Sequence, residues 1–111
     1  MVLKQFADLL GATGRRDDFA ARLGGEEFAL VMPGISPIEA ARLAEQIRRQ
    51  LEAKKWKVGA SGAPLGTVTA SFGVARRRAG ESAVELCNRA DAALYRAKSD
   101  GRNRVVADLD A

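Results

Sequence analysis

One stretch decides the fold: Arg22-Leu23-Gly24-Gly25-Glu26-Glu27-Phe28. Its two glycines stand between short apolar segments, and they predict a tight β-hairpin turn because glycine adopts positive φ without a steric penalty. Glu26 and Glu27 follow at once, and two carboxylates on a fixed backbone suit a hard cation such as Mg²⁺ that carries a nucleotide triphosphate. The same pattern is also typical of an exposed turn with two solvated glutamates, so the local sequence leaves both interpretations open.

The composition is that of one globular domain. The chain has 111 residues, of which 47% are hydrophobic and 29% are charged, and both the length and the proportions are ordinary for a single domain. No apolar run reaches the length of a membrane span, and no signal peptide opens the chain. A single cysteine, Cys87, excludes an internal disulfide. We therefore expect a cytoplasmic location and no membrane contact from this segment, with any anchor belonging to a longer parent protein.

The residue types narrow the chemistry. The chain has no histidine, so any metal must be held by carboxylates and backbone oxygens, which Mg²⁺, Mn²⁺ and Ca²⁺ prefer. The net charge is +4, and the basic residues are dispersed except for the run Arg76-Arg77-Arg78, for which we expect a solvated loop. No nucleic-acid partner is expected, because proteins that bind nucleic acids gather basic side chains on one face.

Hydrophobic periodicity predicts alternating helices and strands. A helical pattern begins at Val2, and residues 19–23 and 28–32 are expected to form the two hairpin strands. The second of these strands is apolar throughout, which predicts burial on both faces. Alternation predicts a half-buried strand over residues 68–74, and we expect short strands at 56–58 and 105–106 with a loop over 59–66.

Two capping boxes mark the beginnings of two longer helices, one at Ser36 with Glu39 and one at Ser82 with Glu85. The first helix is expected to point Arg48 away from the core and to bury Ala40, Leu43, Ala44, Ile47 and Leu51. The second is expected to end at Gly101 and to bury Ala83, Leu86, Cys87, Ala90, Leu94 and Ala97. The pattern predicts an α+β fold in which helices flank a mixed or antiparallel sheet.

These motifs resemble the GGDEF family, the diguanylate cyclases, in the variant that reads Gly-Gly-Glu-Glu-Phe. Residues 24–28 are the signature, and Arg15 and Asp18 match the family's inhibitory Arg-x-x-Asp motif, five residues before Gly24. Residues 68–74 resemble a later strand of the family. Residues 91–103 resemble its C-terminal helix and the turn that follows that helix. The resemblance covers essentially the whole chain and implies a nucleotidyl-cyclase-like fold.

The resemblance implies a reaction between two GTP molecules. Two subunits of a homodimer would face each other, and each 3′-hydroxyl would attack the α-phosphate of the opposite GTP. The products would be cyclic di-GMP and pyrophosphate, with Mg²⁺ or Mn²⁺ as the cofactor. An alternative is a cyclic di-GMP-binding module that uses Arg15 and Asp18 without catalysis, and a third interpretation is an oligomerising domain that binds neither nucleotide.

The resemblance also assigns roles to the signature residues. Glu26 would be the catalytic carboxylate and a metal ligand, and Glu27 would be its neighbour at the substrate. Gly24 and Gly25 would let the backbone approach GTP closely.

Four further residues receive roles from the resemblance. Lys98 and Arg102 would hold the β- and γ-phosphates, although Lys98 also lies where a helix dipole favours a cation without any ligand. Arg15 and Asp18 would bind cyclic di-GMP at the inhibitory site, although the two could equally form a surface ion pair.

The resemblance starts part-way through the family domain. The family's preceding strand, with an Asp-containing segment, and the Gly-Asp pair that enters its first helix have no counterpart in this sequence. Residues 1–111 are therefore interpreted as a single partial domain, the C-terminal two-thirds of the family domain. We expect slow or no cyclase activity from the chain alone, and dimerisation or exchange of elements through an uncovered strand edge.

Overall fold

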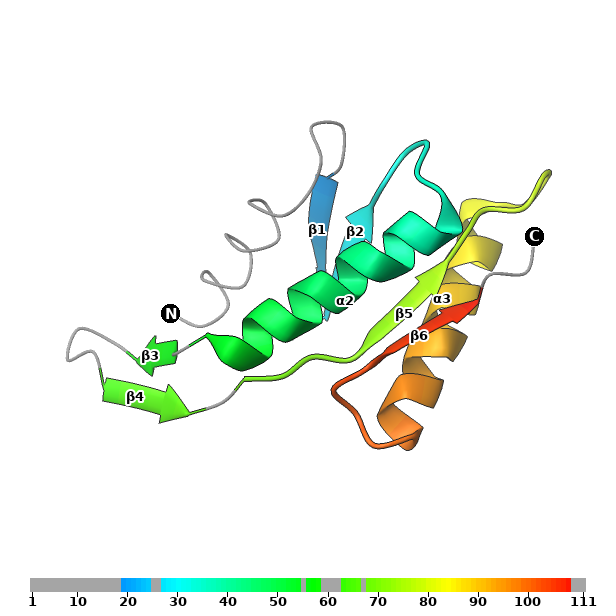
Figure 1. The fold of residues 1–111 in the computed structure, drawn as a ribbon. Helices are drawn as coiled ribbons and strands as arrows, with labels where there is room; N and C mark the ends of the chain where they lie inside the picture. The colour runs from blue at the N-terminus through cyan, green and yellow to red at the C-terminus, as the bar shows by residue number, and fades with distance from the viewer. Residues whose placement is uncertain (1–18, 25–26, 55, 59–62, 67, 109–111) are drawn as a thin grey trace.

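The computed structural model describes residues 19–24, 27–54, 56–58, 63–66 and 68–108. These residues form two helices and six strands, drawn in Figure 1. In chain order the elements are β1 (Phe19–Gly24), β2 (Glu27–Val31), α2 (Pro37–Ala53), β3 (Trp56–Val58), β4 (Ala63–Gly66), β5 (Phe72–Ala75), α3 (Ala83–Ser99) and β6 (Val105–Asp108). The expected α+β class is confirmed, and the helical pattern that begins at Val2 lies outside the described residues.

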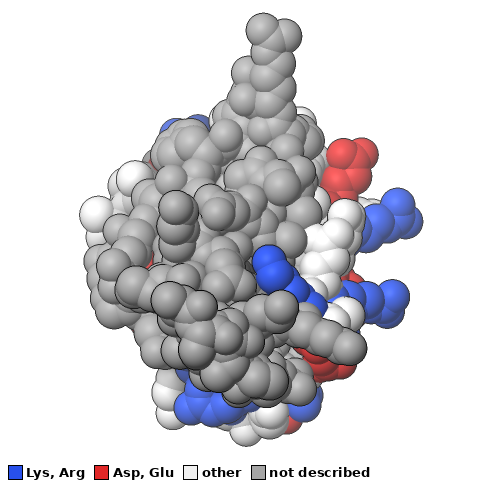
Figure 2. Space-filling view, turned by 90° about the vertical axis from the view of Figure 1, so that its left-hand side faces the viewer, with Lys and Arg blue, Asp and Glu red and all other residues white. Residues whose placement is uncertain are grey.

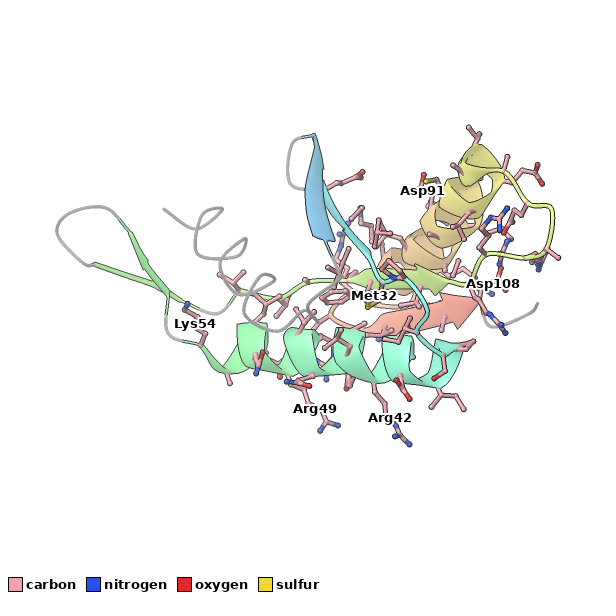
Figure 3. All side chains as sticks on the ribbon, turned by 90° about the horizontal axis from the view of Figure 1, so that it is seen from above. Met32, Arg42, Arg49, Lys54, Asp91 and Asp108 are labelled. Atoms are coloured by element: carbon pink, nitrogen blue, oxygen red, sulfur yellow. The ribbon has the colours of Figure 1, made fainter. Side chains whose placement is uncertain are left out.

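The strands pair as three two-stranded sheets. β1 and β2 are antiparallel, β3 and β4 are antiparallel, and β5 and β6 are parallel. A parallel pair needs a crossover connection, and α3 supplies it between β5 and β6. Figures 1 and 3 show this parallel pair between α2 on one side and α3 on the other. Both kinds of pairing are therefore present among the described strands, in separate sheets.

Helix α2 begins as the sequence predicts. Ser36 is the N-cap, and its side-chain oxygen accepts a hydrogen bond of 3.2 Å from the backbone N–H of Glu39. Ile47 and Leu51 are fully buried on the inner face of the helix. Leu43 from α2 packs against them, and so do side chains from β2, β5 and the segment before β5, namely Leu30, Val68, Ala70 and Phe72. This cluster fixes the hairpin and the parallel pair on one helix face.

Helix α3 lies unusually close to β5. Ala93 and Ala97 of α3 are both 0% exposed. A Cβ atom built on Gly73 of β5 would lie 2.2 Å from the carbonyl oxygen of Ala90 and 2.4 Å from the backbone nitrogen of Leu94. The strand and the helix can therefore approach only because residue 73 has no side chain.

Four sequence-based expectations about the elements need correction. The predicted strand over 68–74 is a strand only from Phe72 onward. The predicted loop over 59–66 contains the strand β4, in which Pro64 pairs with Lys57 of β3. β2 is not buried on both faces, because the side chain of Val31 is 44% exposed.

The buried face of α3 is the other correction. Cys87 is exposed rather than part of the core, and so is Ala83. The helical spacing placed both on the inner face, but Gly73 of β5 approaches α3 at Ala90 and Leu94, further along the helix.

A buried ion-pair cluster joins the turn before α3, the helix itself and the end of β6. Nε and Nη2 of Arg89 each lie 2.7 Å from a carboxylate oxygen of Glu81, whose side chain is only 5% exposed. Nη1 of Arg89 lies 3.2 Å from Oδ2 of Asp108. The backbone N–H of Arg78 also donates to Glu81, at 2.9 Å. Residues 76–78 are exposed as predicted, yet their backbone belongs to this cluster.

Breaking this cluster should lower stability and change its pH dependence. The hydrogen bonds from Arg89, with that from the Arg78 N–H, lower the pKa of Glu81 from 4.5 to about 2. A carboxylate with a lowered folded-state pKa stabilises the fold fully above its unfolded value, and that stability is lost as the pH falls from 4.5 towards 2. We expect Arg89→Ala to lower the melting temperature at neutral pH by about 5–10 °C and to flatten its decline in acid. Thermal unfolding followed by circular dichroism between pH 7 and pH 2 checks this.

The control for that experiment is Arg96→Ala, on the same helix. Arg96 is exposed and makes no contact with Glu81 within the described residues. Its variant should keep the acid decline of the wild type, whereas an unchanged decline in Arg89→Ala would contradict the assignment.

Candidate functional site

The signature stretch forms the predicted hairpin. Strand pairing runs from Phe19 opposite Val31 to Gly24 opposite Glu27, with an irregularity between Arg22 and Gly24. Gly24 therefore ends β1 and Glu27 begins β2. The side chain of Glu27 is exposed, so this carboxylate can meet a ligand from solvent.

Four of the predicted site residues lie outside the described residues. They are Gly25 and Glu26 at the hairpin and Arg15 and Asp18 before β1. Their roles in catalysis, substrate binding and product binding stay predictions.

Lys98 and Arg102 lie on either side of the end of α3. Lys98 is in the last helical turn, Asp100 is the C-cap, and the backbone N–H of Arg102 donates to the carbonyl of Ala97 at 2.9 Å. Both basic side chains are exposed. In Figure 1 α3 ends at the bottom of the view, whereas the β1–β2 hairpin lies behind α2. Within the described residues no hydrogen bond or ion pair joins Glu27 to Lys98 or Arg102, so the structure does not connect the two groups directly.

The turn after α3 has an unusual backbone. Gly101, Arg102 and Asn103 have φ angles of 121°, 64° and 47°. Asn103 is held from several sides: its N–H donates to Ser71 Oγ at 3.1 Å, and its Oδ1 accepts from Arg48 Nη1 at 3.0 Å. These contacts connect the predicted phosphate-binding turn to α2 and to the segment before β5.

Arg48 is the residue whose position the sequence-based expectation missed. It was expected to point away from the core, but its side chain is 16% exposed and reaches Asn103, which lies 55 residues later in the sequence. Its hydrogen bonds lower the pKa of Glu45 to about 2, and Glu45 in turn raises the pKa of Arg48. The ion pairs within α2 had a local signal, because Glu45 and Glu52 lie three and four residues from Arg48, the spacing of helical ion pairs, but the contact with Asn103 had none.

The remaining charged surface is mixed in sign. Figure 2 shows basic and acidic side chains next to one another at the margin of the viewed face. Arg42 and Arg49 project from the outer side of α2 (Figure 3), beside a shallow, open hollow that runs along residues 38–50 of that helix. This hollow includes none of the predicted site residues, so we do not place the site there.

The described residues contain no group of three or more Asp, Glu or Cys side chains that could hold a metal ion. Glu27 is the one carboxylate of the signature among them. The side chains that could bind a metal in this chain are nevertheless mainly hard oxygen ligands. The chain has no histidine, and its single cysteine lies on α3, outside the signature. By ligand type the signature carboxylates therefore fit Mg²⁺ or Mn²⁺.

Neither of the described helices is both long enough and apolar enough to cross a membrane.

Comparison with known proteins gives consistent matches. The family model for the diguanylate cyclase GGDEF domain matches residues 1–104. The chain is 43% identical over 105 residues to diguanylate cyclase VdcA from Vibrio cholerae serotype O1, which is 95% of this chain and 31% of VdcA. The chain spans less than a third of the length of the curated relatives it matches.

Two solved structures are similar over nearly the whole chain. One is the coiled coil and GGDEF domain of DgcB from Caulobacter crescentus in complex with c-di-GMP, with a TM-score of 0.90 and 38% identity, covering 96% of this chain and 56% of that one. The other is the active GGEEF domain of a diguanylate cyclase from Vibrio cholerae, with a TM-score of 0.84 and 29% identity, covering 99% of this chain and 68% of that one. The two likenesses extend the agreement from sequence to fold.

Proposed function

This chain belongs to the GGDEF family of diguanylate cyclases, and on that premise we propose that it is a cyclase domain that joins two GTP molecules into cyclic di-GMP and releases pyrophosphate. The observation that carries the proposal is the family match over residues 1–104. The hairpin at Gly24 and Glu27 supports it, because it holds the signature at the junction of two paired strands. The Gly-Gly-Glu-Glu-Phe variant is shared with a Vibrio cholerae domain described as active.

The end of α3 supports a triphosphate site. Lys98 and Arg102 are exposed cations, and neither side chain forms a hydrogen bond or an ion pair within the described part of the chain. Positive charge that is already in position stabilises the negative charge of a triphosphate and of a departing pyrophosphate. We assign the β- and γ-phosphates of GTP to these two residues.

We assign metal binding to Glu26. When bound, a divalent cation neutralises triphosphate charge and polarises the α-phosphate. Glu26 would supply a carboxylate oxygen, Glu27 would add negative charge beside it, and Gly24 and Gly25 would leave room for the nucleotide next to the backbone.

Two copies of the domain are needed for the reaction. Cyclic di-GMP consists of two identical halves, and a pair of chains, each presenting one GTP to the other, provides both the attacking 3′-hydroxyl and the α-phosphate twice. The partners proposed for this chain are therefore GTP, the cyclic di-GMP product and a second copy of the chain.

The direct test is to incubate the purified chain with GTP and Mg²⁺ and to separate the nucleotides by chromatography. The expected result is cyclic di-GMP with two pyrophosphates per product, at a low rate for this chain alone. Sedimentation should show a population of dimers that grows with protein concentration. A chain that forms no cyclic di-GMP under these conditions would contradict the proposal, whether or not it binds GTP.

A second candidate function is binding of cyclic di-GMP through Arg15 and Asp18. The observation in its favour is that the similar DgcB domain was solved in complex with c-di-GMP. An arginine can contact a phosphate or a guanine edge in bidentate fashion, and an aspartate can accept from the guanine amine and imide. This function is compatible with catalysis, as product inhibition, and also with a non-catalytic receptor.

Calorimetry with cyclic di-GMP tests this second function. Arg15→Ala should weaken binding by about ten- to a hundredfold, because a hydrogen bond to a charged group contributes about 1.5–3 kcal/mol. Arg16→Ala is the matched control, since Arg16 lies outside the motif and its loss should change affinity little. Equal binding by the wild type and Arg15→Ala would remove this function from consideration.

A further inference from the structure

We propose that Arg48 and Asn103, here called the Arg48–Asn103 clamp, are positioning residues that hold Arg102 ready for the terminal phosphates of the nucleotide. The inference rests on the proposed function, because it takes Arg102 as a phosphate ligand. It adds two residues from distant parts of the chain, and neither of them would touch the nucleotide.

The first observation is the conformation of the turn. Arg102 and Asn103 both have positive φ, at 64° and 47°. A left-handed conformation costs a residue such as arginine about 1–2 kcal/mol. Such conformations persist only where the surroundings impose them, and they cluster at functional sites. Other residues must therefore hold this turn in place. They contact it through Asn103, and asparagine tolerates the left-handed region better than most residues.

The second observation is the set of contacts that hold Asn103. Its Oδ1 accepts from Arg48 Nη1 at 3.0 Å, its Nδ2 donates to Glu52 Oε2, and its backbone N–H donates to Ser71 Oγ at 3.1 Å. Arg48 is itself fixed, because its Nη2 donates to Glu45 Oε2 at 2.9 Å. The side chain that reaches across to the turn is therefore locked on α2 before any ligand arrives.

The third observation is the different use of the backbone and the side chain of Arg102. Its N–H donates to the Ala97 carbonyl at 2.9 Å, and its carbonyl accepts from Arg104 Nε at 3.1 Å. Its side chain is exposed and makes no hydrogen bond or ion pair within the described residues. The backbone of Arg102 is therefore fixed by hydrogen bonds, while its cationic side chain remains available for a ligand. Such a residue is partly preorganised, because only its side chain loses conformational freedom when a ligand binds.

A purely structural role for the clamp predicts a different result, and a double-mutant cycle separates the two. If Arg48 acts through Arg102, its loss should matter only while Arg102 is present. If Arg48 merely supports the fold, its loss should add to the loss of Arg102, because independent effects add.

The experiment measures GTP and GMP affinity by calorimetry, in Mg²⁺, for the full chain. The variants are Arg48→Ala, Arg102→Ala, the double variant and Asn103→Gly, which removes the amide but allows positive φ. Arg48→Ala and Asn103→Gly should each weaken GTP binding by about tenfold and leave GMP binding unchanged. In the Arg102→Ala background, Arg48→Ala should cause no further loss.

Arg49→Ala is the matched control. Arg49 also binds Glu45 but is 74% exposed and projects away from the turn (Figure 3), so its variant should bind GTP like the wild type. Additive losses in the double variant, or wild-type GTP affinity in Arg48→Ala, would overturn the clamp.

The clamp and the proposed function can fail separately. A chain whose GTP affinity depends on the clamp but that makes no cyclic di-GMP refutes cyclase activity and supports the clamp. A chain that makes cyclic di-GMP equally well with and without Arg48 refutes the clamp and supports cyclase activity. A wild-type chain that does not bind GTP refutes both.

Discussion

Glu26→Gln is expected to reduce cyclic di-GMP formation by at least about 10²–10³-fold, the loss typical of removing one electrostatic group from a preorganised site. Glutamine keeps the size and shape of glutamate but loses the negative charge that attracts a divalent cation. The fold should be unaffected, because the substitution adds no heavy atoms to the side chain and removes none of its length. Initial rates at saturating GTP and Mg²⁺, followed by chromatography of the product, measure the effect.

Glu27→Gln is the matched control for this experiment. Glu27 is adjacent, exposed and also acidic, so the variant makes the same change in net charge. We expect a smaller loss of rate from Glu27→Gln than from Glu26→Gln, with equal melting temperatures. The reverse order of rates would move the catalytic role from Glu26 to Glu27.

Gly73→Ala should have the largest effect on stability. The new Cβ would lie 2.2 Å and 2.4 Å from backbone atoms of α3, and a helix backbone cannot move aside as a flexible side chain can. Overpacking in a core costs about 1–3 kcal/mol and occasionally more, and we expect at least the upper end of that range. The melting temperature should fall by about 10 °C or more, as thermal denaturation would show.

Gly34→Ala separates the steric cause from a backbone cause. Gly34 has a φ of 69° and no atom within 4 Å of an added Cβ, so only the left-handed conformation opposes alanine there, at about 1–2 kcal/mol. Gly73 does not have a positive φ. If Gly73→Ala destabilised the chain no more than Gly34→Ala, the close approach of α3 to β5 would be wrong.

Features encoded by neighbouring residues were predictable from the sequence. The helix N-caps at Ser36 and Ser82 were located correctly, because a cap is a contact between residues three positions apart. The hairpin was predictable because its glycines, its turn and its strands are contiguous. The family signature gave the candidate site in the same way, from residues that lie together in the chain.

Features that depend on which elements meet were not predictable. Nothing near Arg48 indicates that it contacts Asn103, 55 residues away, and Gly73 looks like any glycine in a strand until α3 is placed against it. Cys87 was assigned to the core by helical spacing. Such spacing shows which residues share one face of a helix, but it does not show how much of that face another element covers. β4 contains Pro64 and Gly66, both typical of loops, and forms a strand because it pairs with β3.

The cluster around Ile47 and Leu51 also sets an order of events during synthesis. Part of the cover of these two side chains comes from Phe72, which the ribosome adds after the whole of α2. At about 5–20 residues per second, the apolar face of α2 is complete roughly one to four seconds before that cover is made. A nascent chain therefore presents this face only partly covered during that interval, in which chaperones could bind it or other chains could aggregate through it.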